Sequence, residues 1–149
     1  MANETAHVAV ANRNQETINH LCADLPAHSP WIVTVAAYKA IHIIEAVFAA
    51  EPGRCHTSDH GDRFRALKAP RYRHIYKHFA PLYRASRIAR YLEDEDSHVA
   101  CFDDYMPPER VPGEFLFHRL KQIENSARGH LKDADALRSI EEARPVVES

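Results

Sequence analysis

The strongest hydrophobic pattern in the chain runs from Trp31 to Ala50 and predicts a long central helix. Ser29 followed by Pro30 is typical of a helix N-terminus, and the next residues that interrupt a helix are Pro52 and Gly53. The segment is rich in β-branched residues, but about twenty residues without a turn are too many for a strand. Apolar side chains occupy most of the circumference, so we expect neighbours to cover this helix on more than one side.

Apolar residues at helical spacing predict three further helices, which we place at 18–25, 71–93 and 114–143. Pro26 should end the first of them. Pro81 lies inside the second, where a proline removes one backbone hydrogen bond and clashes with the preceding turn. We therefore expect a kink or a break near His78.

The segments between these helices have loop-like patterns. Residues 1–13 show no strong period and are expected to form a loose N-terminal arm. Residues 51–62 form a polar stretch, 63–68 fit a short helical turn, and 94–113 form an acidic, proline-rich connection. The pattern as a whole predicts an all-α fold, a bundle of four to five helices.

Length and composition support one such domain over residues 1–149. A chain of 149 residues with 45% hydrophobic and 27% charged residues can build one continuous core and is too short for two ordinary domains. It contains only four glycines, whereas a sandwich or barrel needs many tight turns. The scarcity of glycine therefore favours long helices with few connections.

Charge and cysteine content predict a cytoplasmic protein. The formal net charge is -2, so affinity for nucleic acid must come from a local patch. Cys22, Cys55 and Cys101 are an odd number at wide spacing, which suits reduced thiols better than disulfides. The sequence shows no signal-peptide pattern at its start, and we expect no membrane-spanning segment.

The most specific local pattern for chemistry follows Pro70, where a helix should begin. Arg71 and Arg73 lie in its first turn, and free backbone N–H groups, the helix dipole and guanidinium groups together attract phosphate. His74 and His78 follow within reach and could move protons. RNA cleavage needs only a base, an acid and cations around the phosphorane, so no metal is required. The alternative is that these charges form an ordinary solvated helix face.

Part of the chain, roughly residues 31–92, resembles the HEPN (higher eukaryotes and prokaryotes nucleotide-binding) family. The resemblance is carried by the segment 31–38 with His42 and Glu45-Ala46, by His60-Gly61-Asp62-Arg63, and by Ile75-Tyr76, Pro81-Leu82-Tyr83, Ser86 and Ala89-Arg90-Tyr91. Active members of that family are metal-independent endoribonucleases whose motif is an arginine, a polar residue, a few residues and a histidine. Arg73, His74 and His78 are similar to this motif.

The resemblance implies a dimeric helical bundle without a cofactor that binds RNA or a nucleotide. The implied catalytic residues are Arg73, which would hold phosphate, His74, which would orient or polarise, and His78, which would act as acid or base. Two such motifs would meet across a two-fold axis. The implied setting is a toxin–antitoxin or defence system, with a nucleotidyltransferase as a partner protein. Other members of the family are non-catalytic modules that bind a ligand or a partner, and this alternative stays open.

Further residues could line the same site and bind substrate. His60 and Arg63 lie three residues apart and could reach it from the loop, although helix capping and a surface hydrogen bond also explain them. Tyr38, His42 and Glu45 share one face of the central helix and need polar partners there. A buried histidine that hydrogen-bonds Glu45 or a carbonyl explains His42 equally well.

A metal site is the remaining alternative, because the segment 55–62 is rich in potential ligands. Cys55, His56, Asp59, His60 and Asp62 lie within eight residues. A metal-dependent bundle enzyme could use His56 and His60. Their spacing matches no established zinc signature, and a second segment would have to supply further ligands.

Overall fold

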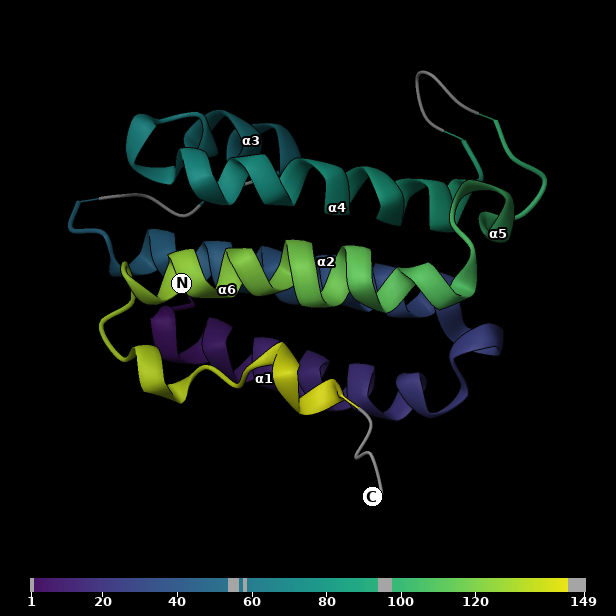
Figure 1. The fold of residues 1–149 in the computed structure, drawn as a ribbon. Coiled ribbons are helices and arrows are strands. Elements are labelled where there is room, and N and C mark those ends of the chain that lie inside the picture. The colour runs from purple at the N-terminus through teal and green to yellow at the C-terminus, as the bar shows by residue number, and fades with distance from the viewer. Residues whose placement is uncertain (1, 54–56, 58, 94–97, 145–149) are drawn as a thin grey trace.

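A computed structural model describes residues 2–53, 57, 59–93 and 98–144, and the described chain is all-α. The central helix α2 (Leu25–Ala50) contacts α1 (Glu4–Leu21), α4 (Arg73–Tyr91) and α6 (Lys121–Arg128). Figure 1 shows α1 with the C-terminal segment on one side of α2 and α6, and α4 with α3 on the other. The predicted all-α bundle is confirmed. The apolar side chains around α2 are covered on several sides, as its pattern predicts.

The prediction of a loose arm over residues 1–13 is wrong, because α1 begins at Glu4. Asn3 caps this helix: its side chain accepts a hydrogen bond from the backbone N–H of Ala6 at 2.9 Å. The buried residues of α1 repeat at helical spacing and are His7, Val8, Ala11, Gln15 and Ile18. Two of them, His7 and Gln15, are polar. Because two core positions are polar, the hydrophobicity of the sequence shows no helical period in this segment.

The start of the central helix also differs from the prediction. After a short 3-10 turn η1 (Cys22–Asp24), α2 begins at Leu25, with Pro26 in its first turn and Pro30 inside it. Pro26 therefore opens α2 and does not end a helix, because the first turn has N–H groups without intrahelical acceptors. Ser29 is a buried helical residue that donates to Asp103 at 3.3 Å, and it is not an N-cap.

One helical run does reach membrane-spanning length, which corrects the expectation from sequence. Within Glu4–Ala50, an 18-residue window has a mean hydropathy of 1.7 and meets the length and charge criteria for a span. Of that window, 78% is buried inside the bundle, as is usual for the core helix of a soluble protein. Its hydrophobicity is therefore accounted for by packing against neighbouring helices.

The segment after α2 carries α3 (His60–Leu67), the 3-10 turn η2 (Pro70–Tyr72) and α4. Asp59 caps α3 by accepting from the N–H of Asp62 at 2.8 Å. Pro81 lies inside α4, which runs from Arg73 to Tyr91 without the predicted break. Ile75, Phe79 and Leu82 are buried along α4, and their packing outweighs the lost backbone hydrogen bond.

The predicted connection contains α5 (Phe102–Tyr105) and the 3-10 turn η3 (Pro108–Arg110), and leads into η4 (Pro112–Leu120), a π-helix. The helix continues as α6 and ends at Arg128, so the prediction of one helix to residue 143 is wrong. Beyond it, η5 (Ala134–Ala136) and η6 (Ile140–Ala143) are short 3-10 turns. The carboxylate of Glu4 accepts from the N–H groups of Lys132 and Asp133 at 3.0 and 2.9 Å, which holds this segment on α1.

A buried ion pair joins the helices to the C-terminal segment. Nζ of Lys39, in the middle of α2, lies 2.8 Å from Glu124 Oε2, and neither side chain is more than 1% exposed. The same ammonium donates to Gln15 Oε1 at 2.5 Å and to the carbonyl of Arg138 at 3.0 Å, while Glu124 Oε1 accepts from the N–H of Ile140 at 2.9 Å. All three ammonium donors have acceptors, so this pair connects α1, α2, α6 and the C-terminal turns.

Candidate functional site

Helix α4 places His74 and His78 on one side and Arg73 on another. Residues four positions apart lie about 40° apart around an α-helix, whereas Arg73 and His78, five apart, are separated by about 140°. His78 is buried, 5% exposed, while Arg73 and His74 are exposed. The structure thus brings the two predicted histidines together and directs Arg73 elsewhere.

A third histidine, His118 of η4, completes a cluster that the sequence did not predict. The ring centroids of His74 and His78 are 4.9 Å apart, and those of His78 and His118 are 5.4 Å apart. Both pairs meet edge to face. His78 therefore lies between two histidines that face solvent, since the side chain of His118 is 45% exposed.

Arg119 places a cation beside His78, in the role that the sequence predicted for Arg73. Its Nη1 lies 3.3 Å from Nδ1 of His78, and its Nε donates to Glu114 Oε1 at 3.1 Å. Because a guanidinium only donates, Nδ1 of His78 must accept and the proton of the neutral ring is on Nε2. We call His74, His78, His118 and Arg119 the histidine cluster.

The surroundings keep His78 neutral. Burial, together with charge repulsion from the neighbouring His74, Arg119, His118 and Lys77, lowers the pKa of His78 to about 4. At neutral pH this ring is therefore a hydrogen-bond donor through Nε2 and a weak base. His74 and His118 are the solvent-facing imidazoles of this group, which a substrate could contact.

The π-helical geometry of η4 positions His118 and Arg119. The buried residues Val111, Phe115, Leu116 and Leu120 follow one another at steps of four, one and four and share one face of this segment. Glu114 and Arg119 are five apart, so the same geometry aligns their side chains. π-Helical segments are rare and are frequently found at functional sites.

Arg71 lies away from the histidine cluster and has a structural contact. Its Nη1 is 2.7 Å from Glu51 Oε1, and the hydroxyl of Tyr72 donates to Glu51 Oε2 at 2.6 Å. These contacts hold the beginning of α4 against the end of α2. The predicted phosphate site at this helix start therefore has one of its two arginines paired with a carboxylate.

The predicted substrate-binding residues His60, Arg63 and Glu45 meet in a second network between α2 and α3. Nε of Arg63 donates to Glu45 Oε1 at 3.0 Å, and both side chains are at least nine-tenths buried. Thr57 also donates to Glu45, and Nη1 of Arg63 lies 2.7 Å from Nδ1 of His60. This buried ion pair secures the loop and α3 on the central helix.

His42 and Tyr38 occupy different environments from Glu45, although all three lie along α2. Nδ1 of His42 lies 3.1 Å from Nδ1 of His7, and burial together with Arg63 lowers the pKa of His42. Burial and Arg63 also lower the pKa of His60. Tyr38 is 44% exposed and contacts Arg90 instead. The predicted residues therefore contact three different sets of partners: Tyr38 contacts Arg90, His42 contacts His7, and Glu45 binds Arg63.

The metal hypothesis rests partly on Cys55 and His56, which lie outside the described residues. Among the residues that the structure does describe, no group of three or more His, Cys, Asp or Glu side chains has a geometry that could hold a metal ion. His60 is instead bound to Arg63 and packs on Tyr83, with ring centroids 5.1 Å apart. Cys22 and Cys101 are free thiols.

No protein-family model matches this chain, and neither curated proteins nor solved structures give a match. Functional inference therefore depends on the histidine cluster and on the network of Glu45, Arg63 and His60. The histidine cluster combines solvent-facing imidazoles, a neutral imidazole N–H and a guanidinium, which together can bind a phosphodiester and move protons.

Proposed function

We propose that the protein is a metal-independent endoribonuclease that acts at the histidine cluster. The observation that carries this proposal is the placement of buried, neutral His78 between two solvent-facing histidines, with Arg119 on its ring. An anionic phosphodiester over His78 would meet the Nε2–H of that ring and the guanidinium, with a proton-transfer group on either side.

His74 is the better candidate for the general base. Its Nε2 lies 3.4 Å from Gln122 Oε1, a contact in which the ring nitrogen donates. Nδ1 is then the nitrogen with a lone pair, as a base requires. This base takes the proton of a 2′-hydroxyl, and the 2′-oxygen attacks the adjacent phosphorus.

His118 is the better candidate for the general acid. Nδ1 of His118 lies 3.7 Å from Glu114 Oε2, a carboxylate that orients the imidazole ring. As the bond from phosphorus to the 5′-oxygen breaks, the imidazolium gives its proton to that oxygen. The products are a 2′,3′-cyclic phosphate and a 5′-hydroxyl, so the step needs no metal and no external reactant.

The resemblance to HEPN proteins supports the same chemistry and adds a homodimer to the proposal. A two-fold axis would bring two histidine clusters onto one RNA, and a nucleotidyltransferase of a toxin–antitoxin or defence system would be the partner protein. Sedimentation of the purified protein at micromolar concentration should show a dimer. A monomer would remove the dimer from the proposal.

The test is cleavage of a mixed-sequence single-stranded RNA in excess EDTA. Wild-type protein should cleave, and His118→Ala should cleave at least about a hundredfold more slowly, the usual loss for a general acid. His20→Ala, a change of an exposed histidine on α1, is the matched control and should cleave as wild type does. Failure of wild type to cleave varied RNAs both in EDTA and with added divalent metal would contradict the endoribonuclease and favour the non-catalytic binding module.

A further inference from the structure

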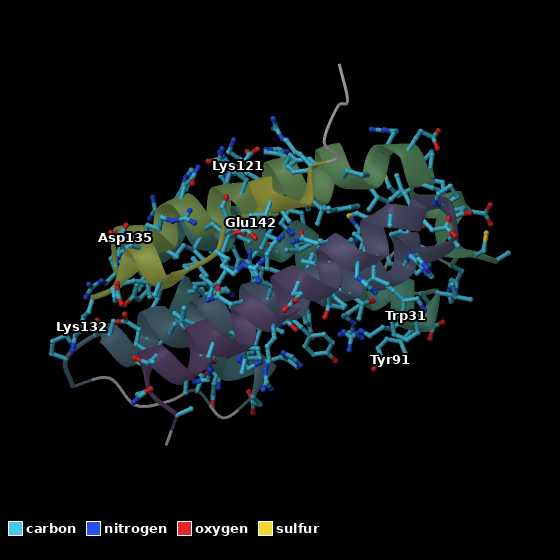
Figure 2. All side chains as sticks on the ribbon, turned by 90° about the horizontal axis from the view of Figure 1, so that it is seen from below. Trp31, Tyr91, Lys121, Lys132, Asp135 and Glu142 are labelled. Carbon is cyan, nitrogen blue, oxygen red and sulfur yellow. The ribbon has the colours of Figure 1, made fainter. Side chains whose placement is uncertain are left out.

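Exposed aromatic side chains gather where the N-terminal half of α2 meets the end of α4. Trp31 is 63% exposed, Tyr91 61% and Tyr38 44%. Trp31 and Tyr38 are seven residues apart on α2, two helical turns, so they project from the same face about 10 Å apart along the axis. Figure 2 shows Trp31 and Tyr91 at the same end of the molecule.

Arg90 connects the two tyrosines into one surface. Its guanidinium carbon lies 5.9 Å from the centre of the Tyr38 ring and 5.1 Å from that of Tyr91, both within cation–π range. Nε of Arg90 donates to the carbonyl of Ser86 at 3.2 Å, which fixes the guanidinium between the two rings. We call Trp31, Tyr38, Arg90 and Tyr91 the aromatic surface.

Arginines of α4 lie beside the aromatic surface although the whole chain is slightly acidic. The segment from Arg63 to Leu92 contains no Asp or Glu, but it contains nine of the 19 Lys and Arg residues. On α4, Arg84, Arg87 and Arg90 follow one another at three-residue steps toward the aromatic surface. Arg63, Arg65 and Arg71 of this segment pair with carboxylates elsewhere, and Glu93 follows Leu92 directly. The positive charge that a phosphate group would meet at the aromatic surface is therefore that of Arg87 and Arg90.

Leu92, next to Tyr91, ends α4 at the edge of the aromatic surface. It is 38% exposed and has a φ of 60°, a left-handed conformation that favours glycine or asparagine. An exposed leucine is unfavourable there both for its backbone and for its apolar side chain.

We infer that the aromatic surface binds single-stranded nucleic acid by stacking unpaired bases on Trp31, Tyr38 and Tyr91. Stacking on aromatic rings combined with arginine contacts to phosphate is the general way in which proteins hold single strands. A duplex is excluded because its bases already stack on one another. The inference requires nucleic-acid binding but not cleavage, so it holds or fails separately from the proposed endoribonuclease.

The experiment uses the full chain and fluorescein-labelled dodecathymidylate, a DNA strand without a 2′-hydroxyl for the proposed reaction to use. Because Trp31 is the only tryptophan, stacking of a base on it should quench the protein's tryptophan fluorescence. Fluorescence anisotropy should show that Tyr91→Ala and Tyr38→Ala each raise the Kd about tenfold, as expected for one lost base stack. Val10→Ala, at an exposed apolar position on α1, is the control and should leave the Kd unchanged.

Three results would overturn the inference. The first is no binding of the oligonucleotide by wild-type protein, which would assign the aromatic surface to a protein partner. The second is equal affinity for the strand paired with oligoadenylate. The third is an unchanged Kd in both tyrosine variants while circular dichroism shows a native helix content. Quenching of Trp31 fluorescence by the oligonucleotide, together with a higher Kd in the tyrosine variants, supports the inference. This holds even if the same preparation cleaves no RNA.

Discussion

Arg119 and His78, 41 positions apart in the chain, lie 3.3 Å from each other across the interface of η4 and α4. This contact fixes the tautomer of the histidine, because the guanidinium can only donate to Nδ1. It also places a permanent cation beside the two solvent-facing histidines. The pair is therefore the structural centre of the proposed phosphodiester site.

The two arginines nearest to the histidines should differ in their effect on RNA cleavage. Arg119→Ala should reduce cleavage about a hundredfold through lost phosphate stabilisation, and Arg119→Lys should restore only part of it because lysine lacks the fork. Arg73→Ala should change the rate little, since Arg73 lies on another side of α4. Initial rates in EDTA measure this, and a larger loss in Arg73→Ala would assign the phosphate role to Arg73.

The depressed pKa of His78 should make the protein less stable in acid. Its pKa is about 4 in the folded protein, against 6.5 for an unperturbed histidine such as that of the unfolded chain, so the unfolded chain takes up the proton first as pH falls. The free energy of unfolding should decrease between these two values, by up to about 3 kcal/mol at about 1.4 kcal/mol per pKa unit.

His78→Gln removes this titration and keeps a side chain that can accept from Arg119. Urea unfolding at several pH values should show a smaller loss of stability below the ordinary histidine pKa for the variant than for wild type. His20→Gln, at an exposed position, should follow the wild-type curve. Parallel curves for His78→Gln and wild type would contradict a depressed pKa.

The buried pair of Lys39 and Glu124 should be sensitive to the loss of one partner. Glu124→Ala leaves an ammonium buried without its carboxylate, which should reduce the free energy of unfolding by about 3 to 5 kcal/mol. The double variant Lys39→Met with Glu124→Leu should recover part of that loss, because it buries no charge, although Gln15, the carbonyl of Arg138 and the N–H of Ile140 lose these hydrogen-bond partners.

Urea denaturation followed by circular dichroism measures both variants of this pair. Lys121→Ala is the matched control, since it breaks a surface pair with Glu141 and should change stability by about 1 kcal/mol or less. If Glu124→Ala also reduced the free energy of unfolding by only about 1 kcal/mol, the other acceptors of the Lys39 ammonium would be sufficient to compensate its charge.

The helices that sequence predicted well are those with an apolar stripe of α-helical period. Helix α2 was predicted because apolar residues surround it, and α4 because Ile75, Phe79 and Leu82 share one face. Only the end of α1, from Ile18, was predicted as helix, because two of its core residues, His7 and Gln15, are polar and have partners supplied by other segments. Their burial depends on tertiary contacts that no local pattern contains.

The candidate site also depends in part on tertiary contacts that no local sequence pattern contains. His74 and His78 could be paired from sequence because four residues make about one helical turn. His118 and Arg119 could not be assigned to them, because their positions depend on the packing of η4 against α4. Leu131 and Leu137 fit a helical spacing but lie beyond the end of α6, where the contacts of Glu4 turn the chain back onto α1.

The most direct test of metal-independent RNA cleavage is an oligodeoxynucleotide that contains a single ribonucleotide, incubated with the protein in EDTA. Wild-type protein should cut only on the 3′ side of the ribonucleotide and leave a 2′,3′-cyclic phosphate and a 5′-hydroxyl, and the all-deoxy strand should stay intact. The double variant His74→Ala with His118→Ala should be folded and at least about a hundredfold slower. No cleavage by wild type, or equal cleavage by the double variant, would contradict the proposed site.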